Sequence, residues 1–87
     1  MELRVHRIGR SVFVTELVRG GRPERATPCV LADVGALFAC SPLRVVLYLE
    51  GRPTMYTEAQ PGPVRSARVR AVLRRLGVDP DTLETRR

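Results

Sequence analysis

Residues 31–50, LADVGALFACSPLRVVLYLE, decide the fold of this chain. The first half predicts a helix, because its apolar residues recur at helical spacing and form one face. These residues are Leu31, Val34, Leu37 and Phe38. The second half supports two interpretations. Ser41-Pro42 is typical of the start of a second helix, whereas residues 45–49 are mostly β-formers and typical of a strand.

The helix interpretation predicts a helix-turn-helix. Such a unit needs a small residue where the helices cross, a turn residue that tolerates unusual dihedral angles, and apolar residues that face inward. Gly35 is the small residue and Ala39 stands at the turn. The inward positions are Val34, Phe38, Cys40, Val45, Tyr48 and Leu49.

With this pattern, residues 30–77 resemble the winged-helix domains of the MerR and excisionase type. The matching features are Leu-Ala-Asp-Val at 31–34, Ser-Pro at 41–42 and Glu-Gly at 50–51. Residues 54–58 stand at the place of a wing strand, and VRSARVRAVLRRL from Val64 stands at the place of the closing helix. The resemblance implies an α+β fold, with a winged helix-turn-helix unit that binds DNA.

Aliphatic residues occupy most of the positions that would face DNA from the second helix. These positions are Leu43, Arg44, Val46 and Leu47. Base edges are read by polar and charged side chains, with aliphatic groups limited to thymine methyl contacts. An aliphatic face left in water is typical of a protein interface. Leu43, Val46 and Leu47 are therefore candidate interface residues.

The strand interpretation predicts a different α+β architecture. Residues 50–53 become a hairpin turn between a strand at 45–49 and a strand at 54–58. The chain then runs ββαββα, an antiparallel four-stranded sheet with two helices on one face. Both interpretations describe one domain over residues 1–87, as expected for a chain of 87 residues.

The whole chain divides into four segments in both interpretations. Residues 1–18 predict a β-hairpin that turns at Gly9-Arg10, and residues 19–28, rich in Arg, Gly and Pro, predict an exposed loop. Residues 29–77 form the core and end with a helix at 66–76, with Ser66 as N-cap and Gly77 as the left-handed C′ residue. Thr27-Pro28 predicts the start of the first helix. Residues 78–87 predict a short turn and tail.

The chain carries a net charge of +6, and its fifteen basic residues are all arginine. The charge is +3 over residues 1–30, −1 over 31–60 and +4 over 61–87. Guanidinium groups suit phosphate and carboxylate partners, so arginines that flank the central stretch are candidates for binding DNA or an acidic protein surface. The candidates are Arg44, Arg52, Arg65, Arg68, Arg70, Arg74 and Arg75. Arg19, Arg22 and Arg25 are interpreted as a solvated loop.

No residue pattern indicates catalysis or metal binding. His6 stands alone in a predicted strand, and Cys29 and Cys40 lack the spacing of metal ligands. We therefore expect no catalytic residues, no cofactor and no metal. No signal segment or membrane span is indicated, which predicts a cytoplasmic protein. A homodimer is one way to enlarge the modest core.

Two functions follow from these expectations. The first is a small DNA-binding protein, a transcriptional regulator or a phage or plasmid accessory factor that contacts phosphates through the flanking arginines. The second is a non-enzymatic interaction module or inhibitor that docks on an acidic protein surface.

Overall fold

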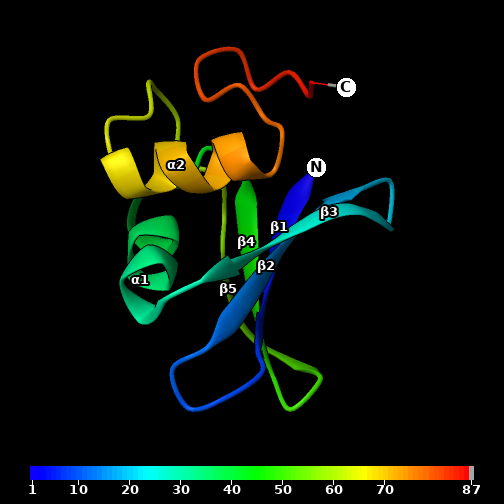
Figure 1. The fold of residues 1–87 in the computed structure, drawn as a ribbon. Helices are drawn as coiled ribbons and strands as arrows, with labels where there is room; N and C mark the ends of the chain where they lie inside the picture. The colour runs from blue at the N-terminus through cyan, green and yellow to red at the C-terminus, as the bar shows by residue number, and fades with distance from the viewer. Residues whose placement is uncertain (87) are drawn as a thin grey trace.

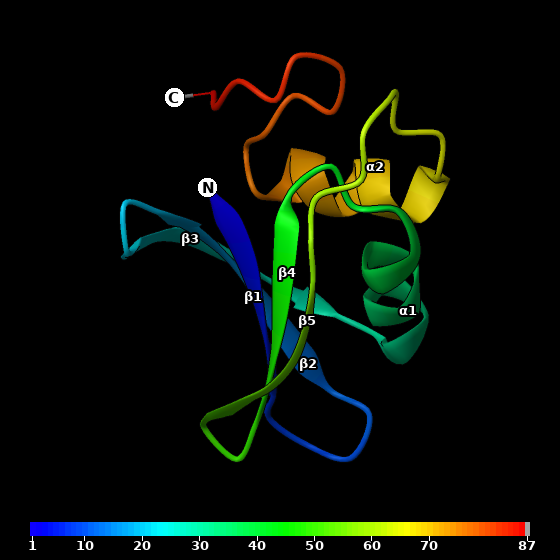
Figure 2. The same cartoon turned by 180° about the vertical axis from the view of Figure 1, so that it is seen from behind.

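The computed structural model describes residues 1–86, over which the chain forms five strands and two helices (Figure 1). The elements are β1 (Glu2–Arg7), β2 (Phe13–Arg19), β3 (Arg22–Cys29), α1 (Leu31–Cys40), β4 (Arg44–Leu49), β5 (Arg52–Thr57) and α2 (Ala67–Arg75). The strands form one sheet in the order β3-β2-β1-β4-β5. Both helices lie on the same face of this sheet (Figure 1, Figure 2). The α+β class is therefore confirmed.

β4 pairs in parallel with β1 at the centre of the sheet, while the other strand pairs are antiparallel. The pair aligns Leu3 with Val45 and Val5 with Leu47. Leu3, Val5 and Val45 are fully buried under the helices. α1 joins β3 at one edge to β4 on the far side of β1, so the connection crosses β2 and β1.

A second helix over residues 42–49 is wrong, because these residues include β4. Flanking strands on both sides satisfy the backbone of β4, and its β-branched residues suit that position. Ser41 is fully buried and ends α1. Its hydroxyl accepts the backbone N–H of Leu43 at 3.0 Å, a local turn that starts no helix. The strand at 45–49 is confirmed, although the sheet has five strands and is mixed, not four and antiparallel.

The exposed loop predicted at 19–28 is also wrong, because most of it is β3. Polar residues and prolines suggested a loop, but β3 is an edge strand and most of its side chains are exposed. Edge strands tolerate proline, since one side of the backbone needs no partner. Gly20 and Gly21 form the two-residue turn into β3, with φ of 57° and 79°. Such turns need two positive φ angles.

The tripeptide Gly-Arg-Pro occurs twice, at 21–23 and 51–53, and it opens both edge strands. In each case the glycine is the last turn residue and has a positive φ angle. The register then shifts beside the proline, opposite residues 17–18 of β2 and residues 47–48 of β4. Prolines and bulges discourage an edge from pairing with another chain.

Both predicted caps of α2 are confirmed, whereas the predicted N-cap of α1 is wrong. Ser66 caps α2 by accepting the Val69 N–H at 3.2 Å. Gly77, with φ of 75°, follows α2, and the Val78 N–H donates to the Leu73 carbonyl at 2.8 Å, as the predicted Schellman motif requires. The N-cap of α1 is Val30, not Thr27, because Thr27 and Pro28 still belong to β3.

Replacing Glu50 with Gly is expected to raise the free energy of unfolding by about 1 kcal/mol, measured by urea titration. Glu50 is a turn residue with φ of 52°. A side chain in the left-handed region costs roughly 1–2 kcal/mol, which glycine avoids in part. The control is Glu24→Gly in the extended β3, which should lower stability. Equal effects at the two sites would contradict the argument.

Candidate functional site

Arginines from three distant segments gather at one end of the molecule. We name this surface the basic end and define it as Arg19, Arg22, Arg25, Arg74 and Arg86. Arg19 and Arg22 face each other across the β2–β3 turn. Arg25 donates to the backbone carbonyl of Arg86 at 3.2 Å, and Arg74 and Arg86 line a common hollow after α2.

The C-terminal segment, residues 78–86, is folded on itself by backbone hydrogen bonds, and Arg19 and Arg25 bind it through their side chains. The Asp79 N–H donates to the Glu84 carbonyl at 2.8 Å, and the Arg86 N–H donates to the Gly77 carbonyl at 2.6 Å. Asp79 accepts the Asp81 N–H at 2.8 Å, which forms the predicted short turn. The tail therefore extends the folded structure through residue 86 and places Arg86 beside β3.

Two carboxylates neutralise part of the basic end. Glu24 lies 2.9 Å from Arg19, and Asp79 lies 3.2 Å from Arg86. Within residues 1–86, no carboxylate oxygen lies within the 4.0 Å ion-pair limit of Arg22, Arg25 or Arg74. These three arginines therefore keep donors for an external anion, since each guanidinium carries five N–H groups.

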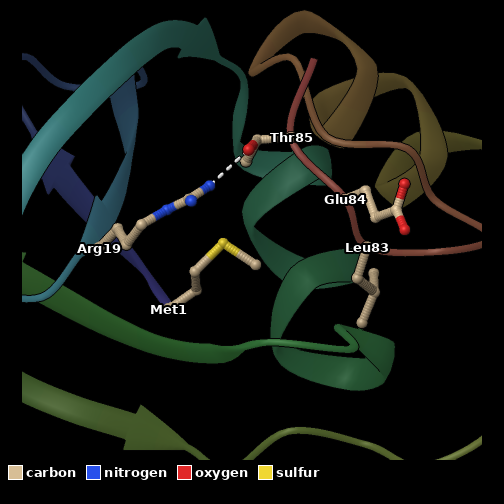
Figure 3. Close-up of a pocket in the computed structure, with 5 residues that line it drawn as sticks. All are labelled: Met1, Arg19, Leu83, Glu84 and Thr85. Carbon is tan, nitrogen blue, oxygen red and sulfur yellow. Dashed lines mark hydrogen bonds between the residues drawn. The ribbon is translucent and has the colours of Figure 1, made fainter. Parts of the chain in front are cut away.

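Arg19 and Thr85 line two hollows in this surface. The first, of about 460 Å³, is lined by Met1, Arg19, Leu83, Glu84 and Thr85. Figure 3 shows Arg19 reaching Thr85 while the Glu84 carboxylate points away from it. The second, of about 340 Å³, is lined by Leu17, Arg19, Glu24, Arg25, Leu76, Thr85 and Arg86. Three arginines and one glutamate are among the residues that line the second hollow.

Most of the arginines predicted on α2 are used inside the fold. Arg68 lies 3.1 Å and Arg75 3.9 Å from Asp33, a carboxylate that also accepts the Val30 N–H at the start of α1. Arg70 makes two hydrogen bonds to Asp81. These contacts tie α2 to α1 and to the C-terminal segment. Only Arg74 of this helix belongs to the basic end.

The remaining predicted arginines do not form one surface with Arg74. Arg44 lies 4.7 Å from the centre of the Tyr56 ring and 3.6 Å from Glu58, at the β5 edge of the sheet. Arg52 is exposed at the start of β5, and Arg65 is exposed in the segment before α2. The seven predicted arginines are therefore divided among internal ion pairs and separate parts of the surface.

The aliphatic residues predicted to face outward are largely covered. Leu43 is 7% exposed and belongs to the core, and Val46 is 9% exposed on the opposite face of the sheet. Leu47 packs partly buried against the core. Alternation along β4 sends successive side chains to opposite faces, so these three residues do not form one exposed apolar face.

His6 lies in a polar network on the face of the sheet that the helices leave open. Its ring stacks on Tyr48 with 4.7 Å between ring centres, and its Nε2 lies 2.6 Å from Glu16. Arg4 and Glu2 pair beside it at 2.7 Å. This face is a mixture of opposite charges, as expected where one side of a sheet meets water.

The sequence predicts neither a metal site nor a membrane span. Across residues 1–86, no three His, Cys, Asp or Glu side chains come together in a way that could hold a metal ion. Cys29 is buried and lies 3.1 Å from the Thr15 hydroxyl, and Cys40 is half-buried. Neither helix of this described part is long and apolar enough to cross a membrane.

The sequence interpretation missed Arg86 and set aside Arg19, Arg22 and Arg25. One local signal was present, because paired glycines directly after a β-rich segment are typical of a hairpin turn. No local signal places Arg86, since its position depends on the turn at Asp79 and on contacts with β3.

Replacing Asp33 with Ala is expected to lower the free energy of unfolding by roughly 1–2 kcal/mol, since it removes a helix-capping acceptor and leaves two arginines without their carboxylate. Thermal or urea unfolding would measure the loss. The control is Glu58→Ala, whose exposed pair with Arg44 should contribute roughly 0–1 kcal/mol. If Asp33→Ala lowered the free energy of unfolding no more than Glu58→Ala does, the contacts of Asp33 with Arg68 and Arg75 would not stabilise the packing of α2 against α1.

The C-terminal segment is expected to loosen in acid. The pKa of Asp79 is lowered mainly by the Asp81 N–H and further by Arg86, and the pKa of Asp81 is lowered by Arg70. Because the folded state binds these protons less tightly, the stabilisation is present above the ordinary value of 3.8 and is lost as the pH falls through the lowered pKa.

Amide NMR signals of residues 79–86, followed from pH 6 downward, would measure this change. In the Asp79→Asn variant, the part of this spectral change that comes from protonation of Asp79 should be absent. An identical acid response in the variant would contradict the assignment.

Scans of the chain against protein families, curated proteins and solved structures found no match.

Proposed function

We propose that this protein is a non-enzymatic nucleic-acid-binding protein, with DNA as the first candidate, and that it contacts phosphates through the basic end. The observation that carries the proposal is the gathering of Arg19, Arg22, Arg25, Arg74 and Arg86 from three segments. A chain with +6 net charge attracts polyanions in general. Because five of the arginines cluster at the basic end, we expect polyanions to bind there.

The proposed contact is made to the phosphate backbone. Phosphate contacts supply most of the affinity of non-specific binding, and they release counterions. The arrangement uses a hairpin turn, the end of α2 and the C-terminal segment, and it needs no recognition helix. The resemblance of residues 30–77 to MerR and excisionase domains points to the same class of ligand by analogy, although residues 44–49 are β4.

A salt titration of binding to random duplex DNA tests the proposal. The protein should bind at low salt, and the logarithm of the affinity should fall linearly with the logarithm of salt concentration. The double variant Arg22→Gln/Arg74→Gln should reduce the slope by about 2, since each lost phosphate contact removes about 0.9. Absence of binding at low salt would contradict the proposal.

The matched control is Arg7→Gln/Arg10→Gln, which removes the same charge from the opposite end of β1. Both residues are exposed, and the β1–β2 loop lies away from the C-terminal segment (Figure 1). This control should change the slope less than the first pair does. Equal changes would mean that the net charge, and not the basic end, governs binding.

An acidic protein partner is the second candidate for the same surface. The contacts of Arg19 with Glu24 and of Arg86 with Asp79 are carboxylate contacts of the kind that such a partner would offer. In the same assay, an acidic peptide that binds while duplex DNA does not would favour this candidate.

A further inference from the structure

The second hollow of the basic end is built differently from the surrounding surface. Its lining includes Leu17 and Leu76, which are 1% and 0% exposed, so its floor lies directly over the hydrophobic core. Its sides come from β2, β3 and the C-terminal segment. Its volume of about 340 Å³ is at the small end of ligand pockets, which span roughly 300–1,000 Å³.

The charge around this hollow favours an anion. Three arginines line it, Arg19, Arg25 and Arg86, and Glu24 is the single lining carboxylate. Arg19 pairs with Glu24 and Arg86 pairs with Asp79, so Arg25 is the lining arginine without a carboxylate partner within residues 1–86. With Asp79, the carboxylate that pairs with Arg86, counted beside Glu24, these charged groups sum to +1. A phosphate monoester carries about −1.5 to −2 at neutral pH and offers three acceptor oxygens.

The donors of the hollow are held in place before any ligand arrives. The Arg25 guanidinium rests on Gly77, where an added Cβ would lie 3.0 Å from its Cζ. Arg19 Nη2 donates to the Thr85 hydroxyl at 2.5 Å, which leaves the hydroxyl proton available to a further acceptor. Backbone bonds fix residues 79–86, so the wall that carries Arg86 is ordered. Preorganised donors reduce the cost of binding.

We propose that this hollow is a binding site for a phosphate monoester, and not merely part of a diffuse basic surface. A terminal phosphate can reach the floor with one substituent behind it, whereas a phosphate inside a strand has sugars on both sides. Guanidinium forks match the oxygens of the terminal group. The monoester is the 5′-phosphate end of a strand, which rests on the proposed function, or a small phosphorylated molecule.

The experiment compares ligands that differ by one phosphate. Isothermal titration would use a single-stranded oligonucleotide with a 5′-phosphate and the same oligonucleotide with a 5′-hydroxyl. Adenosine 5′-monophosphate, adenosine and inorganic phosphate form the second arm. We expect the phosphate to improve oligonucleotide binding by about tenfold or more, the gain typical of charge-assisted hydrogen bonds. Amide signals near Arg19, Arg25 and Thr85 should shift with the phosphorylated ligands.

Variants then locate the effect. Arg25→Gln should abolish the preference for the phosphate, and Arg25→Lys should weaken it, because lysine keeps the charge but loses the fork. Arg10→Gln removes the same charge at the far end of β1 and should keep the preference. Thermal melting of each variant checks folding, and the NMR shifts of the unaltered protein test the site even if a variant fails to fold.

The outcomes separate the two sources and the two proposals. A preference confined to oligonucleotides assigns the strand end, and equal binding of the mononucleotide assigns a small phosphorylated molecule. Equal affinity for both members of each pair, with no shifts around the hollow, would overturn the site. If salt-dependent duplex binding persisted in that case, the proposed function would stand. Binding of adenosine 5′-monophosphate without any binding of the oligonucleotides or of duplex DNA would support the site and contradict the proposed function.

Discussion

The parallel pairing of β1 with β4 is the contact on which the rest of this structure depends. It brings Leu3, Val5 and Val45 together as the fully buried centre of the core. Because β4 lies beside β1 and not beside β3, α1 must cross the sheet, and α2 lies on the same face as α1 (Figure 2). The opposite face is left to water and to the network around His6.

Arginine in this protein has two separate tasks. On α2, Arg68, Arg70 and Arg75 are bound to acids or carbonyl groups of other elements and hold the fold together. At the basic end, Arg22 and Arg74 are exposed and have no carboxylate partner within residues 1–86, while Arg25 uses one donor on the Arg86 carbonyl and keeps the others. The density of arginines along the sequence therefore does not locate the candidate site. The densest cluster lies on α2, but this helix contributes only Arg74 to the basic end.

The two Gly-Arg-Pro turns lie at the two edges of the sheet, and each places one arginine at the end of a hairpin. A glycine at positive φ closes each hairpin, and proline with a register shift follows at the start of each edge strand. These features discourage pairing of the edges with another chain. They also place Arg22 and Arg52 at the hairpin ends. Arg22 lies opposite Arg19, which donates to Thr85 of the C-terminal segment. Arg52 lies on the other edge strand, outside the basic end.

The sequence by itself determined the features that depend on near neighbours along the chain. Ser66, the spacing of Val69, Val72 and Leu73, and Gly77 define α2 with both its caps, and the β1–β2 hairpin follows from its β-formers and its turn. Caps and short turns are set by hydrogen bonds within a few residues, so such signals can be read locally.

Only the tertiary structure decided the nature of residues 41–50 and the location of the candidate site. The same apolar spacing fits an inward helix face or a strand, and the hydrogen bonds of β4 to β1 and β5 selected the strand. The basic end joins residues up to 67 positions apart, from Arg19 to Arg86. Its arginines are neighbours because the C-terminal segment folds back on β3, a long-range contact that no local pattern encodes.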